Sequence, residues 1–312
     1  MKIIQTLHSE FEKETVVTIG TFDGVHIGHQ KIIERLVTSA KKNGLKSTIL
    51  TFFPHPRMVL QKDTSIKLLN TIDEKAAILE ALGLDYLVIK KFTKIFSRIK
   101  AEDFVSDILV KQLQAKKIII GYDHHFGRNR TANIDDLRKF GNNYQFDVEE
   151  ISAQDINDVS VSSTKIRTAL LKGDIKTANN YLGYNYMLTG TVISGKGLGK
   201  DIGFPTANLF IKENYKLIPA EGVYVIKSEI NKHTYFGMMN IGTNPTVNDN
   251  DNQYIEINFF NLDASLYGQK LKIDMLERIR NEQKFNSVSE LQAQLKRDKQ
   301  TALQYIKNYA TH

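Results

Sequence analysis

The 312-residue sequence contains no cysteine, which excludes disulfide bonds and thiolate metal sites. It also has no apolar run long enough to span a bilayer. The N-terminal segment MKIIQTLHSEFEKE is too polar for a secretory signal peptide. We therefore expect a cytoplasmic protein that does not bind membranes.

A clustered basic arm is absent as well, although the formal net charge is +7. An excess of basic residues is typical of proteins that bind nucleic acid, an anionic membrane surface or phosphorylated small molecules. Here the Lys and Arg residues are scattered, and ordinary solubility is a sufficient explanation. We expect no nucleic-acid partner, and the sequence leaves a homo-oligomer possible.

The N-terminal part of the chain alternates short apolar runs with helical patterns. The expected strands cover residues 15–22, 47–53, 86–92 and 116–121. The expected helices cover residues 32–40, 73–83 and 104–113. This alternation predicts an α/β fold with a parallel sheet, in which ligands bind beyond the carboxyl ends of the strands.

The pattern changes at about residue 186, where six strand-like segments follow one another closely with turn residues between them. They predict a small antiparallel barrel or sandwich. The tail from Ser287 reads as an amphipathic helix with an apolar face formed by Leu291, Leu295, Leu303 and Ile306. We expect two domains, residues 1–184 and 185–312, because the chain is too long for one compact core.

The segment TIGTFDGVHIGHQ places two histidines between the first strand and the helix that begins near Gly28. Free N–H groups at a helix N-terminus favour bound phosphate, and imidazoles can donate hydrogen bonds to its oxygens. Gly20 and Gly24 would let the backbone approach a ligand. A single histidine in such a place is usually structural, but the pair His26 and His29 favours a phosphate site.

A second segment, SVSSTKIRTALLKGD, opens another helix with three hydroxyl residues, Ser162, Ser163 and Thr164. Helix capping alone would account for the hydroxyls. Lys165 and Arg167 add positive charge at the same end, which suits a polyphosphate.

These motifs, with PHP at 54–56 and GYDHHFG at 121–127, resemble the bacterial bifunctional riboflavin kinase/FAD synthetase family. The resemblance continues through GFPTANL, GVY, YIEINFFNLDASLYGQ and IRNEQKF, and so covers nearly the whole chain. It implies a Rossmann-like nucleotidylyltransferase domain with a parallel sheet, followed by a small antiparallel β-barrel domain with a C-terminal helix.

For the first domain, the resemblance implies that the phosphate of FMN attacks the α-phosphorus of ATP, giving FAD and pyrophosphate. That phosphate is already anionic, so the site has to align two anions and stabilise the leaving group. His26 and His29 would be the catalytic pair, and His55 and Asp123 would bind FMN. The residues implied for ATP binding are Gly20, Phe22, Asp23, His26, His29, Ser162, Ser163, Thr164 and Arg167.

In the second domain, the segment SGKGLGKDIGFPTANL is rich in glycine but is not a Walker A motif, and a flexible turn is an equal explanation. Thr206 and Asn208 would share one face of a strand, where two neutral oxygens plus ATP phosphates suit Mg²⁺. Thr and Asn are also ordinary residues on a solvent-exposed face of a strand. The residues expected to bind ATP here are Gly195, Lys196, Gly197, Gly199, Lys200, Thr206 and Asn208.

Glu256 shares a strand face with Tyr254 and Asn258, and the resemblance places the catalytic carboxylate of a riboflavin kinase at this position. A solvent-facing glutamate is the alternative. The implied reaction transfers the γ-phosphate of ATP to the neutral 5′-hydroxyl of riboflavin, which benefits from a base. Four residues depart from the family pattern, namely His124, Lys200, Asn244 and Asn258.

Three readings compete. The chain is a two-site enzyme that makes FMN and then FAD, or an adenylyltransferase with an inactive kinase barrel, or its barrel binds nucleic acid. No strand clusters aromatic residues with Lys or Arg, which disfavours the last reading. A flavin-dependent oxidoreductase is disfavoured because no G-x-G-x-x-G follows the first strand.

Overall fold

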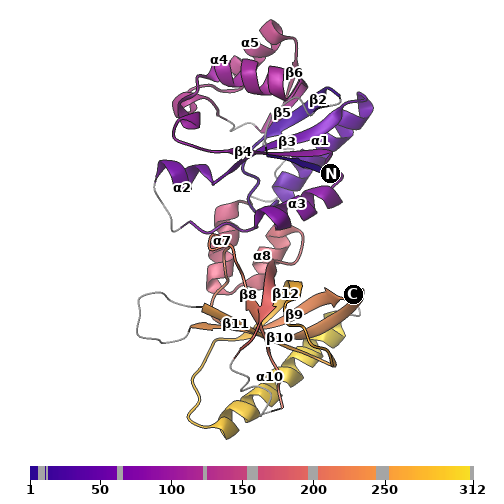
Figure 1. Ribbon diagram of the computed structural model, residues 1–312, viewed down its shortest axis with the longest axis vertical. Helices are drawn as coiled ribbons and strands as arrows, with labels where there is room; N and C mark the ends of the chain where they lie inside the picture. Colours follow the sequence, from indigo (N-terminus) through magenta and orange to yellow (C-terminus); the bar gives the residue numbers. More distant parts are fainter. Residues whose placement is uncertain are drawn as a thin grey trace. The chain divides into compact units, whose positions relative to one another are not determined.

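The computed structural model describes residues 1–5, 11, 13–61, 66–121, 125–152, 161–195, 203–243 and 253–309. The chain packs as two compact units, residues 1–162 and 163–312, which are drawn in Figure 1. Helices α7 and α8 thus belong to the second unit. They precede the expected domain boundary at residues 184/185, which stays a prediction about where the two activities divide.

The first unit contains a six-stranded parallel sheet of order β1-β4-β3-β2-β5-β6. The strands are β1 (Lys2–Ile4), β2 (Thr15–Ile19), β3 (Lys46–Phe53), β4 (Tyr86–Lys91), β5 (Ala115–Gly121) and β6 (Asp147–Ile151). The helices are α1 (Ile27–Lys42), α2 (Pro56–Leu60), α3 (Ile72–Ala81), α4 (Ala101–Asp103) and α5 (Ile134–Tyr144), with short 3₁₀ turns η1 (Phe96–Arg98) and η3 (Arg128–Arg130). The helix expected over 104–113 forms as a π-helix, η2 (Phe104–Gln112).

Alternation along the strands gives this sheet two apolar faces. Val16 packs with side chains of α1 and α3, whereas its neighbour Val17 packs with side chains of η2 and α5. Both residues are fully buried. Because both faces are covered by helices, the strands are nearly continuous apolar runs, as expected for a parallel sheet.

The second unit is a closed barrel of six antiparallel strands in the order β10-β11-β8-β7-β12-β9. Its strands are β7 (Met187–Ile193), β8 (Ala207–Phe210), β9 (Gly222–Ile230), β10 (His233–Thr243), β11 (Gln253–Phe259) and β12 (Lys270–Arg280). Its helices are α7 (Ser163–Lys172), α8 (Ile175–Leu182) and α10 (Val288–Tyr309). This confirms the expected α/β domain followed by a small barrel with a C-terminal helix.

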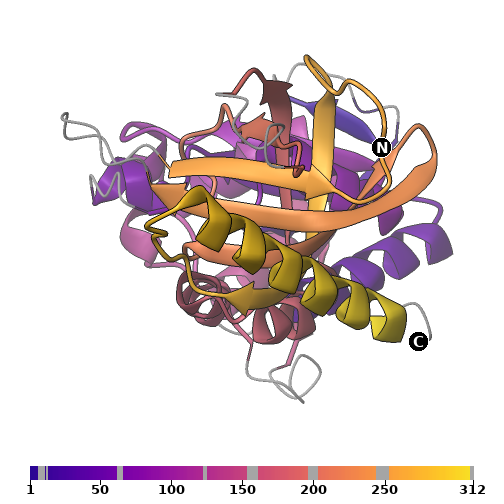
Figure 2. The same cartoon turned by 90° about the horizontal axis from the view of Figure 1, so that it is seen from below.

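Helix α10 lies along the outside of the barrel, as Figure 2 shows. It packs against an outer-face cluster that includes Val223, Val225 and Met238. Leu303, expected on the apolar face, is instead 45% exposed. The reason is helical geometry, since Ala302 is fully buried and the next residue is turned about 100° away from it.

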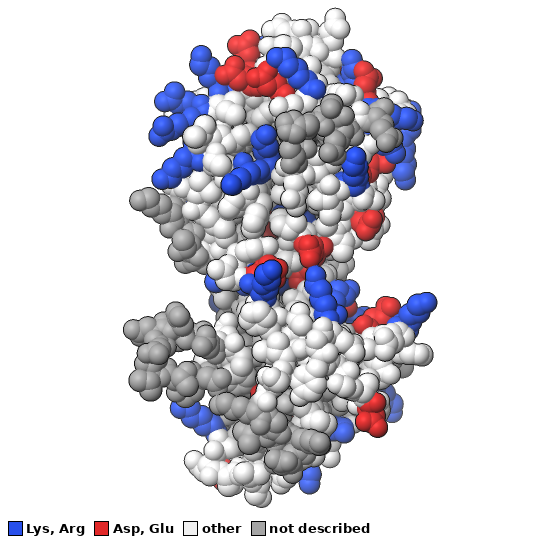
Figure 3. Space-filling model, in the orientation of Figure 1, with Lys and Arg blue, Asp and Glu red and all other residues white. Residues whose placement is uncertain are grey.

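On the face that Figure 3 shows, Lys and Arg side chains lie dispersed, with Asp and Glu among them. No described helix has both the length and the apolar composition needed to cross a membrane.

Candidate active sites

The histidine segment follows β2 at the carboxyl edge of the parallel sheet. The order of the strands reverses between β2 and β5, which makes this the switch point where ligands bind in open α/β sheets. The segment containing His55 follows the neighbouring strand β3, and residues 125–127 come shortly after β5. Because these strands are parallel, their carboxyl ends lie at the same edge of the sheet.

The loop formed by residues 20–26 has an unusual backbone. Phe22 and Val25 have φ values of 44° and 37°, which are costly for residues other than glycine. A Cβ on Gly20 would lie 3.0 Å from the Phe22 ring, so glycine here makes room for that ring. Phe22 is itself buried and packs edge-on against His29, with 5.1 Å between ring centroids.

His26 is the N-cap of α1, and its Nδ1 accepts a long hydrogen bond, 3.4 Å, from the backbone N–H of His29. The two imidazole rings stack, with centroids 3.6 Å apart. A neutral imidazole that accepts through Nδ1 carries its proton on Nε2. His26 therefore has an N–H donor to offer a phosphate while its other nitrogen completes the helix start.

Both imidazoles are held neutral. Burial lowers the pKa of His26 to about 4, although the nearby charge of Asp23 opposes the shift. Burial also lowers the pKa of His29 well below its usual value, and repulsion from a protonated His26 and from the charge of Lys75 adds to this effect. The Nδ1 atom of His29 is buried and has no hydrogen-bond partner. An approaching anion would thus meet N–H dipoles of uncharged rings.

His55 caps the short helix α2, where its Nδ1 accepts from the N–H of Arg57 at 3.2 Å. The preceding Phe53–Pro54 bond is cis. Asp123 and His124 lie outside the described residues. The helix expected at the second phosphate motif is α7, which begins at Ser163, as predicted. Within its unit, Ile166 is fully buried and Arg167 is half-buried.

In the barrel, strand register places three polar residues in one row. Asn208 on β8 is opposite Glu256 on β11, and Glu256 is opposite Asn240 on β10. Directly opposite residues on neighbouring strands share a face, with Cβ atoms about 5 Å apart. The predicted face of Glu256 is confirmed, because its neighbours Ile255 and Ile257 are buried on the opposite side.

Two contacts fix the segment that carries Thr206 and Asn208. Strand β8 begins at Ala207, so Thr206 precedes it rather than lying inside the longer strand expected. The side-chain amide of Asn258 donates to the Pro205 carbonyl at 2.8 Å. A Cβ on Gly195 would lie 1.9 Å from Nδ2 of Asn208, so only glycine fits there without displacing that amide. Lys196, Gly197, Gly199, Lys200 and Asn244 lie outside the described residues.

Sequence analysis placed Tyr254 on the face of Glu256 but missed Asn240 and Glu282, which contact Tyr254. The Tyr254 hydroxyl donates to Glu282 at 2.7 Å and accepts from Asn240 Nδ2 at 3.3 Å. Burial, followed by the charge and hydrogen bond of Glu282, raises the pKa of Tyr254. The Asn240 Oδ1 atom is buried without a partner. Alternation along β10 and β11 was the available signal for their shared face.

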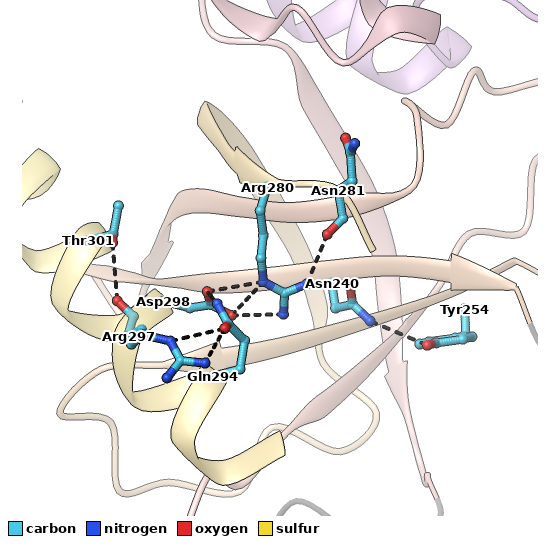
Figure 4. A network of polar contacts seen from close by, with 8 residues as sticks. All are labelled: Asn240, Tyr254, Arg280, Asn281, Gln294, Arg297, Asp298 and Thr301. Carbon is cyan, nitrogen blue, oxygen red and sulfur yellow. Dashed lines mark hydrogen bonds and ion pairs between the residues drawn. The ribbon is translucent and has the colours of Figure 1, made fainter. Parts of the chain in front are cut away.

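Figure 4 shows how β12 and α10 are joined close to these residues. Arg280 forms an ion pair with Asp298 at 2.8 Å, and Asp298 also accepts from Gln294 at 2.7 Å. The side chain of Asp298 is 2% exposed. The ion pair therefore fixes α10 against the barrel.

No group of three or more His, Asp or Glu side chains suited to a metal occurs among the described residues. The residues expected to hold a metal in the barrel are of a different kind, the neutral oxygens of Asn208 at the start of β8 and of Thr206 just before it. Oxygen donors of this kind fit Mg²⁺, which keeps several waters and binds substrate phosphates.

Comparison with known proteins assigns a family to each part of the chain. The FAD synthetase family model matches residues 8–165, and the riboflavin kinase model matches residues 182–306. A bifunctional riboflavin kinase/FMN adenylyltransferase from Bacillus subtilis is 36% identical over 99% of both chains. Its counterpart from Escherichia coli K12 is 35% identical over 98% of both.

A solved structure described as a macrolide-efflux protein from Streptococcus pneumoniae has a TM-score of 0.86 and 30% identity. The match covers 96% of this chain and 98% of that one. Both family segments are thus present in the expected order, and the relatives match along nearly their whole length. The chain belongs to the family of bifunctional riboflavin kinase/FMN adenylyltransferases.

Proposed function

We propose that this enzyme phosphorylates riboflavin to FMN and then adenylylates FMN to FAD, using ATP in both steps. The observation that carries the proposal is the arrangement of two separate sites, one in each family segment. In one, a histidine N-cap lies at the switch point of a parallel sheet. In the other, Asn208 and Glu256 are opposite each other on the barrel.

In the adenylyltransferase reaction, an oxygen of the FMN phosphate forms a bond to the α-phosphorus of ATP. The bond from that phosphorus to the bridging oxygen of the β-phosphate breaks, and pyrophosphate leaves with the electron pair. The Nε2–H group of His26 would donate a hydrogen bond to a phosphate oxygen. The N-terminus of α1 would add its partial positive charge. No proton has to be removed, which fits neutral imidazoles.

Other residues complete this first site by the family pattern. The proposed ATP-binding residues are Gly20, Phe22, Asp23, His29, Ser162, Ser163, Thr164 and Arg167. His55 and Asp123 are proposed to bind FMN. The positions of His26, His29 and His55 support this assignment, because all three follow strands at the switch edge.

In the kinase reaction, Glu256 would accept the proton of the riboflavin 5′-hydroxyl while that oxygen bonds to the γ-phosphorus and ADP leaves. Thr206 and Asn208 would hold Mg²⁺, which neutralises charge on the ATP phosphates when bound. The glycine-rich segment with Gly195, Lys196, Gly197, Gly199 and Lys200 is proposed to cover those phosphates. Gly195 supports this, because its lack of a side chain leaves space for the Asn208 amide.

We place the division between the two activities at residues 1–184 and 185–312. We also propose that the enzyme works in the cytoplasm on small molecules, without nucleic acid or membrane partners, and that a homo-oligomer is compatible with these roles.

The test is incubation of the chain with riboflavin, ATP and Mg²⁺, followed by chromatographic separation of the flavins. FMN and FAD should both form, with FMN first. FAD formed only from added FMN would leave an adenylyltransferase with an inactive kinase barrel. No conversion of either flavin would contradict the proposal.

A further inference from the structure

Lys75 is a buried cation that the proposed chemistry does not use. It lies in the first turn of α3 and is only 4% exposed. Burial lowers its pKa, because a charged ammonium loses its hydration. The partial positive charge at the helix N-terminus opposes a cation there as well. The charge of a lysine at this position must therefore be stabilised by specific partners.

Its partners belong to the loop formed by residues 20–26. The Lys75 ammonium donates to the Thr21 carbonyl at 2.7 Å, and the charge of Asp23 favours its protonated form. Asp23 is 3% exposed and its Oδ1 accepts from the N–H of Leu69 at 2.9 Å. The side chain from α3 is thus joined to the loop through a carbonyl and a buried carboxylate.

This loop needs external support because two of its residues, Phe22 and Val25, have positive φ values. Such conformations persist only where the surroundings enforce them. The Thr21 carbonyl is held by two donors, Lys75 and the Thr51 hydroxyl, the latter at 3.2 Å. The loop ends at His26, whose imidazole caps α1 and stacks on His29.

We propose that Lys75 is a positioning residue for adenylyl transfer, which holds the loop so that His26 and His29 face the phosphates in a fixed geometry. The role rests on the proposed function, since it assigns that loop to ATP. Lys75 acts through Thr21 and Asp23 and does not itself touch the reacting atoms.

The test compares Lys75→Met with Lys41→Met in the full-length chain, because Lys41 is exposed at the far end of α1 and controls for loss of charge. FMN adenylylation should fall on the order of 10²-fold in Lys75→Met, as for a small misplacement of reacting groups. Riboflavin phosphorylation should be unchanged, and Lys41→Met should keep both activities. Equal adenylylation rates in wild type and Lys75→Met would overturn the proposal.

A second measurement does not depend on activity. NMR titration of the imidazoles should show the pKa of His26 rising from about 4 toward 6.5 in Lys75→Met, because a loosened loop exposes the ring. His26 is the better reporter, since the charge of Lys75 acts directly on His29. An unchanged His26 titration would overturn the positioning role, whereas a wild-type chain without adenylylation would overturn only the proposed function.

If Lys75→Met does not fold, the double variant Lys75→Met with Asp23→Asn removes both members of the buried charge pair. Loss of the Asp23 charge alone would lower the His26 pKa further. A His26 pKa above that of Asp23→Asn alone would therefore report reduced burial of the ring and would support the proposal. A value equal to that of Asp23→Asn alone would contradict it.

Discussion

At the scale of single residues, His26 begins helix α1 and also belongs to the proposed phosphate site. Its Nδ1 is an N-cap acceptor, and its ring is buried. The same burial lowers its pKa to about 4 from an ordinary value of 6.5. A histidine used in this way is a fixed hydrogen-bond donor near neutral pH, and its titration is linked to folding.

The first prediction concerns that linkage. The unfolded chain binds a proton at His26 below about pH 6.5, whereas the folded chain does so only below about pH 4. Neutral His26 therefore makes its full contribution to the free energy of unfolding above pH 6.5. This contribution, about 3 kcal/mol, is lost as the pH falls toward 4. His26→Asn, which keeps an N-cap acceptor, should flatten this dependence.

Native-state hydrogen exchange of α1 and β2 measures the stability of the first unit at each pH. The same variant should lose FMN adenylylation on the order of 10²-fold and keep riboflavin phosphorylation. A pH dependence as steep as that of wild type would show that the ring of His26 is not neutral and buried in the folded chain.

The second prediction concerns Glu256 and its neighbours in the barrel. Glu256→Gln keeps the shape of the side chain but cannot accept a proton, so riboflavin phosphorylation should fall about 10²–10⁴-fold. Thr206→Ala and Asn208→Ala should also lower it, but higher Mg²⁺ should restore part of the loss if their oxygens bind the metal. Conversion of supplied FMN to FAD should be unaffected in all three variants.

Steady-state kinetics of both half-reactions across a Mg²⁺ titration separates these roles. Wild-type kinase rates in Glu256→Gln would reduce this glutamate to an ordinary polar residue of the outer face. Recovery of Glu256→Gln at high Mg²⁺ would argue for a role at the metal instead of a role as base.

At the scale of elements, the ion pair of Asp298 with Arg280 connects α10 to β12. A buried charge that loses its partner costs about 3–5 kcal/mol. We therefore expect Asp298→Ala to destabilise the second unit by this amount, because Arg280 is only 18% exposed. Lys296→Ala, on the exposed side of the same helix, should change little.

Hydrogen exchange of α10 and β12 amides checks this expectation, with adenylylation as the internal control for the first unit. If protection of α10 were the same in Asp298→Ala and in Lys296→Ala, the packing of its apolar residues alone would hold the helix.

Elements with a clear apolar period could be predicted from the sequence, and others could not. Strands β2, β3, β4 and β5 are apolar because helices cover both faces of the sheet. Strand β6 escaped prediction because its sequence, DVEEI, is largely acidic at the edge of the sheet. Strand β1 has only three residues.

Site residues divide in the same way. The positions of His26, His55 and Glu256 in the fold could be predicted from the sequence, because motifs and strand ends locate them. Lys75 could not, because a lysine after two acidic residues in a first helical turn looks exposed. Its burial depends on the Thr21 carbonyl and Asp23, which lie more than 50 residues earlier in the chain. Contacts of that separation leave no local pattern.

At the scale of the whole molecule, helix α7 carries a motif implied for the first activity, yet α7 and α8 belong to the same unit as the barrel. Asn179 on α8 donates to the Met275 carbonyl at 2.9 Å and accepts from the N–H of Tyr186 at 2.7 Å. The C-terminal half of α7 is also tied to the barrel unit, since the Leu170 carbonyl accepts from Ala220 at 3.0 Å and that of Lys172 from Arg278 at 3.3 Å. The two helices are therefore part of the second structural unit.

The last prediction follows from this packing. Ile175, Ala178 and Leu182 of α8 are fully buried, and burial of one large aliphatic side chain contributes about 1.5–3 kcal/mol. A fragment of residues 163–312 should therefore unfold at a clearly higher temperature than one of residues 185–312. Riboflavin phosphorylation should be stronger in the longer fragment wherever the shorter one is partly unfolded. Calorimetry and kinase assays on both fragments decide the matter. Equal midpoints would mean that the barrel is complete without these helices and that their contacts are incidental to its stability.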